Sequence, residues 1–379
     1  MKVGFISFHS FANPGGVKSH ILGLSKEFEK MGVENKIIVP RRNFFENYGK
    51  NVIILGTSIP INIAGTQGDL CFNFNPFAIK KILEKEKFDV LHFHNFIIPS
   101  GWQILNKSKS LNILTFHANL DSLGKLIKTF YFSDRFFKEL GEKIDGLIGV
   151  ANLNLENFQE SPKPKAVIPN GIDLNDFHPN YPKIKRFLDK KINILFVGRI
   201  EERKGLIYLL EAYNLLKPIY NDIRLIIVGD GILKQSCLDY TRANRLKDVH
   251  FEGAKNNLEL KKYFSTCDIY CSPAIFGESF GIVLLEAMAM GKPVCGFANS
   301  GYQELLKNTK GEEFLALPKD SSGLAEKLEI LIKSKSLRQE MGNWGLEHVK
   351  QYSWEKIAKQ VLDFYKSCQK AKINIIDKK

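Results

Sequence analysis

The 379-residue sequence lacks any apolar run long enough to cross a membrane. Its longest hydrophobic stretches, such as Ile223–Val228, have the length of a strand, whereas a membrane-spanning helix needs roughly 18 or more apolar residues. The chain begins directly with a strand-like segment, Lys2–Phe8, which argues against a signal peptide. We therefore expect a cytoplasmic protein.

Paired cysteines are also missing. The six cysteines are scattered, and no two have the CxxC spacing of a zinc or redox site. Cys267 and Cys271 flank a strand-like stretch and are expected to be core thiols. The histidines show no metal-ligand spacing either, so we expect no bound metal.

The sequence has no basic arm, although its net charge is +13, because the excess of lysine and arginine is spread evenly over both halves. A basic protein attracts anions, which include nucleic acid, anionic lipid and phosphorylated substrates. A non-enzymatic protein that binds nucleic acid or an anionic surface is one reading of this charge. The absence of a basic stripe with interleaved aromatics argues against nucleic-acid binding.

Strands and helices alternate along the chain, and the chain is too long for a single ordinary core. Such a rhythm predicts parallel sheets covered by helices, repeated in two doubly wound α/β domains. A polar stretch at 180–191 suggests the division. We predict an N-terminal domain at 1–187, a C-terminal domain at 188–352, and a last segment, 353–379, whose helix packs back on the N-terminal domain.

The segment Val197–Gly205 (VGRIEERKG) follows a predicted strand and precedes a predicted helix. Ligands of open α/β sheets bind at the carboxyl ends of strands, where Arg199 and Lys204 would lie. Two cations at this place could hold a diphosphate. An ordinary surface loop with salt bridges is the alternative.

A second segment, Gly277–Glu286, places Glu278 in a loop and Glu286 on a predicted helix, with seven residues between the two glutamates. The backbone N–H groups that open this helix would point at an anion. They belong to Phe280, Gly281, Ile282 and Val283. A carboxylate beside a sugar accepts hydrogen bonds from hydroxyls. The alternative is a glutamate that only complements the helix dipole.

These segments resemble glycosyltransferase family 4, a large retaining family with the GT-B fold of two Rossmann-like domains facing across a cleft. The resemblance rests on ESFGIVLLEAMAMGKPV with its two glutamates, and on motifs spread over nearly the whole chain. The motifs are GGVKSH (15–20), DVLHFHNF (89–96), TFHANL (115–120), VIPNGID (167–173), VGRIEERKG (197–205), IIVGDG (226–231) and YSWEKIA (352–358).

The resemblance implies a donor site in the C-terminal domain. Arg199 and Lys204 would stabilise the diphosphate of a GDP- or UDP-hexose as it leaves, so no metal cofactor would be required. Glu278 would hold sugar hydroxyls, and Glu286 would hold the ribose.

The resemblance also implies roles in the N-terminal domain. Gly15 and Gly16 would let the first loop approach the donor phosphates without a Cβ in the way. His117 would lie over the reacting sugar, although its position alone favours an ordinary loop or core histidine. The neighbouring histidines His20, His92 and His94 are expected to be structural.

Within the family, the chain most resembles the phosphatidylinositol mannosyltransferases, through IPINIAGTQGDLCFNFNPFAIKKIL, TFHANLDS and GESFGIVLLEAMA. It departs from many relatives at Phe276 and at 299–304, which bears on the donor sugar. The implied reaction moves mannose or glucose to a lipid or other glycan acceptor, with a phosphatidylinositol-type lipid first. A nucleotide-sugar epimerase of the same fold and a transferase to a soluble acceptor are the alternatives.

Two basic, apolar segments could rest on an anionic membrane surface at the inner face of the cell membrane. The segment 77–88 carries Lys80 and Lys81, and the aromatic-rich segment 123–140 carries Lys125 and Lys128. We expect these lysines to contact membrane or acceptor. The alternative is that both segments are ordinary helices whose apolar sides lie in the core.

Overall fold

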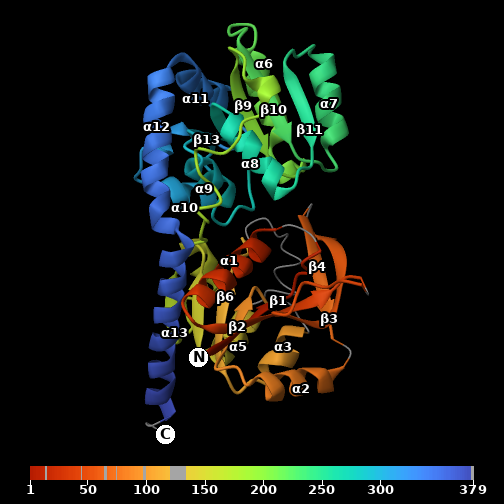
Figure 1. Ribbon diagram of the computed structural model, residues 1–379, viewed down its shortest axis with the longest axis vertical. Coiled ribbons are helices and arrows are strands. Elements are labelled where there is room, and N and C mark those ends of the chain that lie inside the picture. The colour runs from red at the N-terminus through yellow and green to blue at the C-terminus, as the bar shows by residue number, and fades with distance from the viewer. Residues whose placement is uncertain are drawn as a thin grey trace. The chain divides into compact units, whose positions relative to one another are not determined.

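The computed structural model describes residues 1–12, 15–43, 45–63, 66–73, 75–96, 100–119 and 134–376 (Figure 1). The chain forms two compact units. The first contains Met1–Gly171 together with Trp354–Lys379, and the second contains Ile172–Ser353. The boundary placed at 187 and 188 from the polar composition thus falls inside the second unit, where Phe187 is buried.

The first unit is a helix-covered sheet. In the described residues its sheet has the strand order β4-β3-β2-β1-β5-β6-β7-β8. All neighbouring strands are parallel except β3 and β4. Its elements are β1 Lys2–Ser7, α1 Gly16–Lys30, β2 Glu34–Arg41, β3 Val52–Ile63, β4 Thr66–Phe72, α2 Pro76–Glu86, β5 Val90–His94, α3 Ser100–Leu105, β6 Leu111–Phe116, α5 Asp134–Lys143, β7 Gly146–Gly149, η1 Asn152–Phe158, β8 Lys165–Val167 and α13 Trp354–Ile376.

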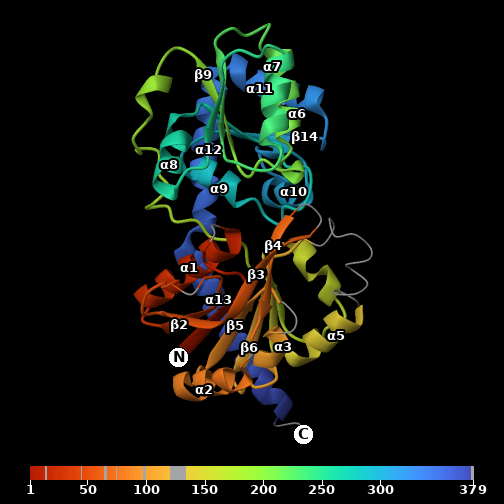
Figure 2. The same cartoon turned by 90° about the vertical axis from the view of Figure 1, so that its right-hand side faces the viewer.

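Alternating side chains of the strands bury two faces of this sheet. Phe5 of β1 packs with α1 and α13, whereas its neighbour Ile6 packs with α2, α3 and α5. Figure 2 shows α1 on one side of the sheet and α5 on the other. A strand buried on both faces reads as a continuous apolar run, which explains the KVGFIS sequence of β1.

The hairpin of β3 and β4 is an element that the sequence pattern did not reveal. Gly56 has φ 85° and lies where the register between β2 and β3 shifts. Beyond Thr57, β3 pairs only with β4, so Pro60 lies where pairing on the β2 side has ended. Glycine and proline are tolerated at such irregular positions. In a sequence, however, both residues argue against predicting a strand.

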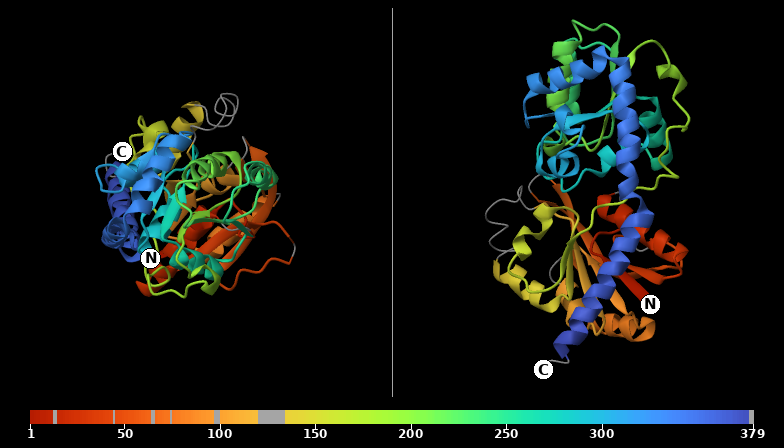
Figure 3. Two further views of the ribbon diagram at one scale, coloured as in Figure 1. Left: turned by 90° about the horizontal axis from the view of Figure 1, so that it is seen from above. Right: turned by 90° about the vertical axis from the view of Figure 1, so that its left-hand side faces the viewer.

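Helix α13 begins at Trp354 and belongs to the first unit although its sequence follows the second. Its apolar side, with Ile357, Val361 and Tyr365, packs on α1 and on the sheet (Figure 3). Gly23 of α1 gives room for the Trp354 ring, since a Cβ there would lie 2.1 Å from it.

The second unit has a parallel sheet of strand order β11-β10-β9-β12-β13-β14. Helices α6 and α11 cover one face, and Phe264 of α8 packs against Tyr270 on the other. Its elements are η2 Lys185–Phe187, β9 Ile192–Val197, η3 Glu202–Lys204, α6 Leu206–Leu216, β10 Ile223–Val228, α7 Lys234–Ala243, β11 Val249–Gly253, α8 Asn257–Thr266, β12 Ile269–Ser272, α9 Ile282–Ala289, β13 Val294–Phe297, α10 Ser300–Leu306, η4 Glu312–Phe314, β14 Leu315–Ala316, α11 Ser321–Lys333, α12 Lys335–His348 and η5 Val349–Tyr352.

Both units are therefore Rossmann-like, as the alternation of strands and helices predicts. Among the described helices, none is both long and apolar enough to span a membrane.

Candidate functional site

In the sheet of the second unit, the order in which strands are added reverses at β9. From β9 the chain first adds β10 and β11 on one side, then returns to place β12 on the other side. The loops that follow β9 and β12 therefore leave the sheet next to each other, at the kind of switch point where open α/β sheets bind ligands. These loops carry the two segments that the sequence singles out.

Cations from the first loop meet a carboxylate from the second. Lys204 Nζ donates to Glu278 Oε1 over 2.6 Å, and Arg203 donates to the same oxygen over 2.8 Å. The side chains of Lys204 and Glu278 are only 11% and 13% exposed, so this pairing is little weakened by solvent. Glu201 joins the cluster through Arg203 (2.5 Å) and Arg199 (3.4 Å).

The cluster sets the charge of Glu278. Burial alone would raise the pKa of this carboxyl, but the charges of Lys204 and Arg203 outweigh burial and lower it below the usual value. Glu278 is thus an anion at neutral pH. Arg199 differs from the other cations because its side chain is 43% exposed, which leaves its guanidinium accessible to a ligand.

The turn between Glu278 and α9 depends on a glycine, Gly281. Gly281 caps α9 with φ 100°, and a Cβ there would lie 2.8 Å from the ring of Tyr302. The residues that follow, Ile282 and Val283, form the first turn of α9, whose N–H groups have no acceptor within the helix. An anion placed before this turn would find donors and the positive end of the helix dipole.

Glu286 lies one turn into α9 and is half-buried. Burial raises its pKa to about 7, although the nearby Lys204 and Lys261 act in the opposite direction. Lys261 forms an ion pair with Asp176, which offsets part of its charge. Glu286 is therefore partly protonated near neutrality, unlike Glu278.

In the first unit, the loop after β1 leads into α1. Gly15 is the N-cap of α1, and a Cβ built on it would meet nothing within 4 Å. Gly16 begins the helix. Packing within the first unit therefore does not require a glycine at position 15.

His117 directly follows β6 and meets two other histidines. His94 Nδ1, at the end of β5, lies 3.1 Å from His117 Nε2, and the ring of His20 on α1 lies 4.8 Å from that of His117. Burial lowers the pKa of all three rings, to about 4 for His20, so they are neutral at physiological pH. Their grouping is a feature that sequence spacing did not show.

A further histidine of the first unit, His92, is held by hydrogen bonds to neighbouring elements. His92 of β5 contacts Thr115 through Nε2 and Tyr365 of α13 through Nδ1, both over 2.6 Å. Both ring nitrogens are thus occupied, and the side chain is fully buried. His92 therefore fixes β5 to its neighbours, as expected for a structural histidine.

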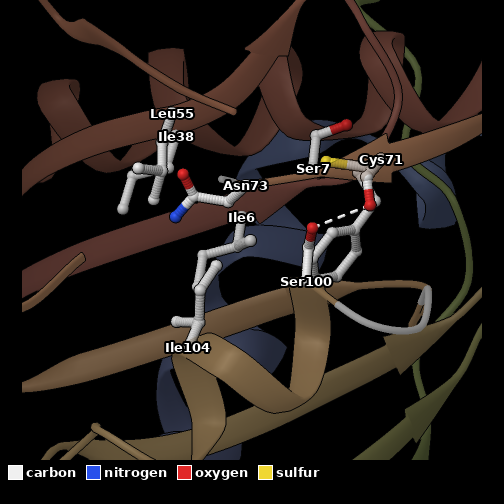
Figure 4. Close-up of a pocket in the computed structure, with 9 residues that line it drawn as sticks. Ile6, Ser7, Ile38, Leu55, Cys71, Asn73, Ser100 and Ile104 are labelled. Atoms are coloured by element: carbon white, nitrogen blue, oxygen red, sulfur yellow. Dashed lines mark hydrogen bonds between the residues drawn. The ribbon is translucent and has the colours of Figure 1, made fainter. Parts of the chain in front are cut away.

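The first unit also contains a small cavity, whose lining includes none of these histidines (Figure 4). Ser100 donates to the carbonyl of Cys71 over 2.8 Å at its edge. The cavity has no acidic, basic or histidine lining, so it offers no charged partner to a phosphate. It is lined by Ile6, Ser7, Phe8, Ile38, Leu55, Cys71, Asn73, Ser100 and Ile104.

The two segments expected to contact a membrane differ in how exposed their side chains are. In α2, Ile79 is buried while Lys80 and Lys81 are exposed, and Phe77 is 80% exposed. Lys125 and Lys128 lie outside the described residues. In α5, Phe136 and Phe137 of the second segment are buried in the core of the first unit, so these two aromatic side chains are not available to a membrane.

Arg203 and Glu201 also belong to the charged cluster around Glu278, and the sequence analysis gave neither of them a role. Both lie inside the VGRIEERKG segment, so the only available signal was their place next to Lys204. The contact of Arg203 with Glu278 depends on how two loops distant in sequence meet, whereas its contact with Glu201 lies within one loop.

Known proteins match both units. Residues 14–176 match the family described as glycosyltransferase family 4, and residues 178–348 match glycosyl transferases group 1. The chain is 31% identical to a phosphatidyl-myo-inositol mannosyltransferase of Mycobacterium leprae, over 97% of both chains. It is 29% identical to the protein of that name from Mycolicibacterium smegmatis, over 99% of this chain and 96% of the relative.

A sucrose-phosphate synthase from Thermosynechococcus elongatus has a similar structure, with a TM-score of 0.77 at 21% identity over 98% of this chain and 99% of that chain. Two Rossmann-like units with this likeness define a GT-B fold. The chain belongs to the family 4 and group 1 glycosyltransferases. The predicted fold class and enzyme class are thereby confirmed.

Proposed function

We propose that this enzyme transfers a hexose, mannose or glucose, from a GDP- or UDP-sugar to a phosphatidylinositol-type lipid with retention of configuration. The observation that carries the proposal is the cluster of Lys204, Arg203 and Glu278 at the switch point of the second unit. The full-length similarity to relatives named phosphatidyl-myo-inositol mannosyltransferase supports the acceptor class.

Stabilising the departing diphosphate is the main task of such an enzyme. In the proposed complex, Lys204 and Arg199 bind the diphosphate oxygens, and the N–H groups of Gly281, Ile282 and Val283 add donors. These groups are fixed before the donor arrives, so little reorganisation opposes the reaction. Since the protein supplies this positive charge, we propose that transfer needs no metal ion.

Glu278 and Glu286 have different proposed roles because their environments differ. Ionised Glu278 accepts hydrogen bonds from sugar hydroxyls, with Arg203 and Lys204 holding its carboxylate in place. Glu286, with a pKa of about 7, binds the ribose hydroxyls. Neither is proposed as a nucleophile. The acceptor attacks on the face that the diphosphate leaves, and a departing phosphate oxygen takes its proton.

In the first unit, Gly15 and Gly16 are proposed to admit the donor phosphates, and His117 to contact the reacting sugar. The neutral ring of His117 can donate or accept a hydrogen bond without adding positive charge beside a developing oxocarbenium ion.

The lipid acceptor requires access to a membrane, and we propose that α2 provides part of it. Phe77 projects into solvent, with Lys80 and Lys81 exposed on the next turn. Such a surface adsorbs reversibly to anionic headgroups, because each lysine contributes about 1 kcal/mol near a charged leaflet. Lys125 and Lys128 are proposed to act with it. The enzyme would then work as a peripheral protein at the inner face of the cell membrane.

The test is to incubate the enzyme with GDP-mannose, UDP-glucose and related donors, with phosphatidylinositol vesicles and with soluble sugar acceptors, and to analyse products by mass spectrometry. A glycosylated phosphatidylinositol supports the proposal. A product formed only on the soluble acceptors overturns the lipid assignment. An epimerised or hydrolysed donor without any acceptor product favours the epimerase reading instead.

A further inference from the structure

We propose that Glu201 is a positioning residue for the transfer reaction, whose carboxylate holds the guanidinium of Arg199 where it meets the departing diphosphate. The inference rests on the proposed function, because it takes Arg199 as a ligand of the diphosphate. Glu201 lies in the loop after β9 and is only 7% exposed. A buried carboxylate is costly unless cations pair with it, so its two arginine partners are part of the structure of the loop.

Both oxygens of the Glu201 carboxylate have a cation beside them. Oε1 lies 2.5 Å from Arg203 Nε, and neither atom has a hydrogen-bond partner elsewhere in the described part of the chain. Oε2 lies 3.4 Å from Arg199 Nη1. The backbone N–H of Glu201 donates to the carbonyl of Arg199 over 3.0 Å, and its carbonyl accepts from the N–H of Lys204 over 3.1 Å. One residue thus contacts the three cations of the VGRIEERKG segment.

Arg203 fixes this carboxylate relative to the loop after β12. Its Nη1 donates to Glu278 over 2.8 Å, while its Nε faces Glu201. Its backbone carbonyl also accepts from the N–H of Ile275, in the loop after β12, over 2.8 Å. The donors of a guanidinium lie in one rigid plane, so Glu201 and Glu278 are held at a set separation. The ion pair of Glu201 with Arg199 therefore places Arg199 relative to Glu278.

Orientation is what Glu201 contributes to the reaction. Three cations, Arg199, Arg203 and Lys204, remain to bind a diphosphate whether or not Glu201 is charged. Arg199 is 43% exposed, however, and its long side chain would adopt several rotamers without a partner. A displacement of about 1 Å can lower a reaction rate by about a hundredfold. Loss of Glu201 should therefore affect turnover more than donor binding.

Glu201→Gln keeps the size of the side chain and removes its charge. In the full chain, with the donor and acceptor identified by the test above, kcat should fall at least about tenfold while KM for the donor changes less than about threefold. Glu202→Gln, the same substitution at the exposed neighbouring position, is the matched control and should retain both constants. Circular dichroism verifies folding. A parent-like kcat for folded Glu201→Gln would overturn the proposal.

Glu201→Asp is the second variant, for the case in which Glu201→Gln does not fold. It retains the charge that pairs with Arg203 and withdraws the carboxylate by one methylene, so the ion pair with Arg199 lengthens. We expect kcat to fall at least about threefold, again with little change in KM for the donor. An unchanged kcat would contradict the positioning role.

A double-mutant cycle tests whether Glu201 acts through Arg199. Arg199→Ala should lower kcat by itself. Adding Glu201→Gln to it should cost less than about threefold more, because the guanidinium that Glu201 positions is already absent. Losses that multiply in the double variant would show that Glu201 acts independently of Arg199, which would overturn the proposal.

A measurement without transfer separates this proposal from the proposed function. Phenylglyoxal modifies guanidinium groups, and mass spectrometry of the digested chain gives its rate of reaction at Arg199. Modification of Arg199 should be at least about threefold faster in Glu201→Gln than in the parent or Glu202→Gln, because the carboxylate no longer holds the guanidinium. A parent without any transfer activity would refute the proposed function alone. Equal rates at Arg199 in all three proteins would overturn the role of Glu201.

Discussion

Lys204 Nζ lies 2.6 Å from Glu278 Oε1, although 74 positions separate the two residues in the sequence. The same oxygen accepts from Arg203, so one carboxylate is held by two cations that come from the neighbouring loop. The pairing fixes both the side chain proposed to bind the diphosphate and the side chain proposed to bind the sugar. The predictions below follow from this cluster and from the elements around it.

Replacing Lys204 or Arg199 with alanine should lower turnover by about tenfold or more. Each substitution removes a positive charge that the proposed transition state needs, and a loss of about 1.4 kcal/mol accounts for a tenfold effect. Steady-state kinetics with the donor and acceptor identified above are the measurement.

Lys310→Ala is the control for these variants, because Lys310 pairs with Glu340 on the surface. It should retain turnover. If both Lys204→Ala and Arg199→Ala retained the activity of the parent, the diphosphate assignment would be wrong.

Glu286→Gln should change how stability depends on pH. The folded-state pKa of Glu286, about 7, is above its ordinary value of 4.5, so folding favours the protonated form. The associated stability is fully present below pH 4.5 and is lost as pH rises through 7. Relative to the parent, the glutamine variant should therefore gain about 2 kcal/mol between pH 5 and pH 8.

Thermal unfolding of the parent and of Glu286→Gln at several pH values measures this difference. Glu326→Gln, at an exposed position of α11, is the control for the substitution itself. Parallel pH profiles for the parent and Glu286→Gln would show that Glu286 titrates normally.

Transfer should continue in excess EDTA. Lys204 and Arg199 are proposed to supply the positive charge that a divalent cation provides in metal-dependent enzymes. Turnover with and without EDTA, and after adding Mg²⁺ or Mn²⁺, is the measurement. Loss of all activity in EDTA that either cation restores would contradict the prediction.

The protein should sediment with vesicles that contain anionic lipid, and less so as salt increases. Screening acts over about 8–10 Å at 0.1–0.15 M salt, so contacts by exposed lysines are weakened. Changing Lys80 and Lys81 to glutamate should reduce binding, and changing Lys107 and Lys109 to glutamate serves as a control for charge alone. Failure of the parent to bind at low salt would favour a soluble acceptor.

Gly281→Ala should destabilise the enzyme by about 1–3 kcal/mol. The new Cβ would lie 2.8 Å from the Tyr302 ring, at a φ of 100° that alanine adopts only with strain. Gly15→Ala is the matched comparison, because its φ of −179° is ordinary extended backbone and its Cβ would meet nothing within 4 Å. Equal melting temperatures for both variants would show that the turn at Gly281 is not constrained.

Local patterns predicted many elements of both sheets. Each of the strands Leu111–Phe116 and Ile192–Val197 and the helix Leu206–Leu216 is a largely apolar or helically periodic run in the sequence, which is the signal that local patterns give. The hairpin of β3 and β4 was not predicted, since Gly56 and Pro60 interrupt its pattern.

The candidate site was only partly predictable. Arg199, Lys204 and Glu278 could be selected because each stands near the end of a predicted strand. Arg203 could not be distinguished from an ordinary surface arginine, since its role depends on a contact with Glu278 across two loops. The aromatic residues Phe136 and Phe137 suggested a membrane surface, but both pack in the core. Phe136 lies against Phe96, and Phe137 lies against Phe116 and Phe158.

The sequence by itself determined which residues alternate, which face inward, and which polar groups follow each strand, because these depend on spacings of two to four residues. Only the tertiary structure decided which of those polar groups meet. The order of the strands brings Lys204 to Glu278, and it brings His20, His94 and His117 together from α1, β5 and the end of β6. Such contacts depend on how elements far apart in sequence pack side by side, and local spacing carries no record of that order.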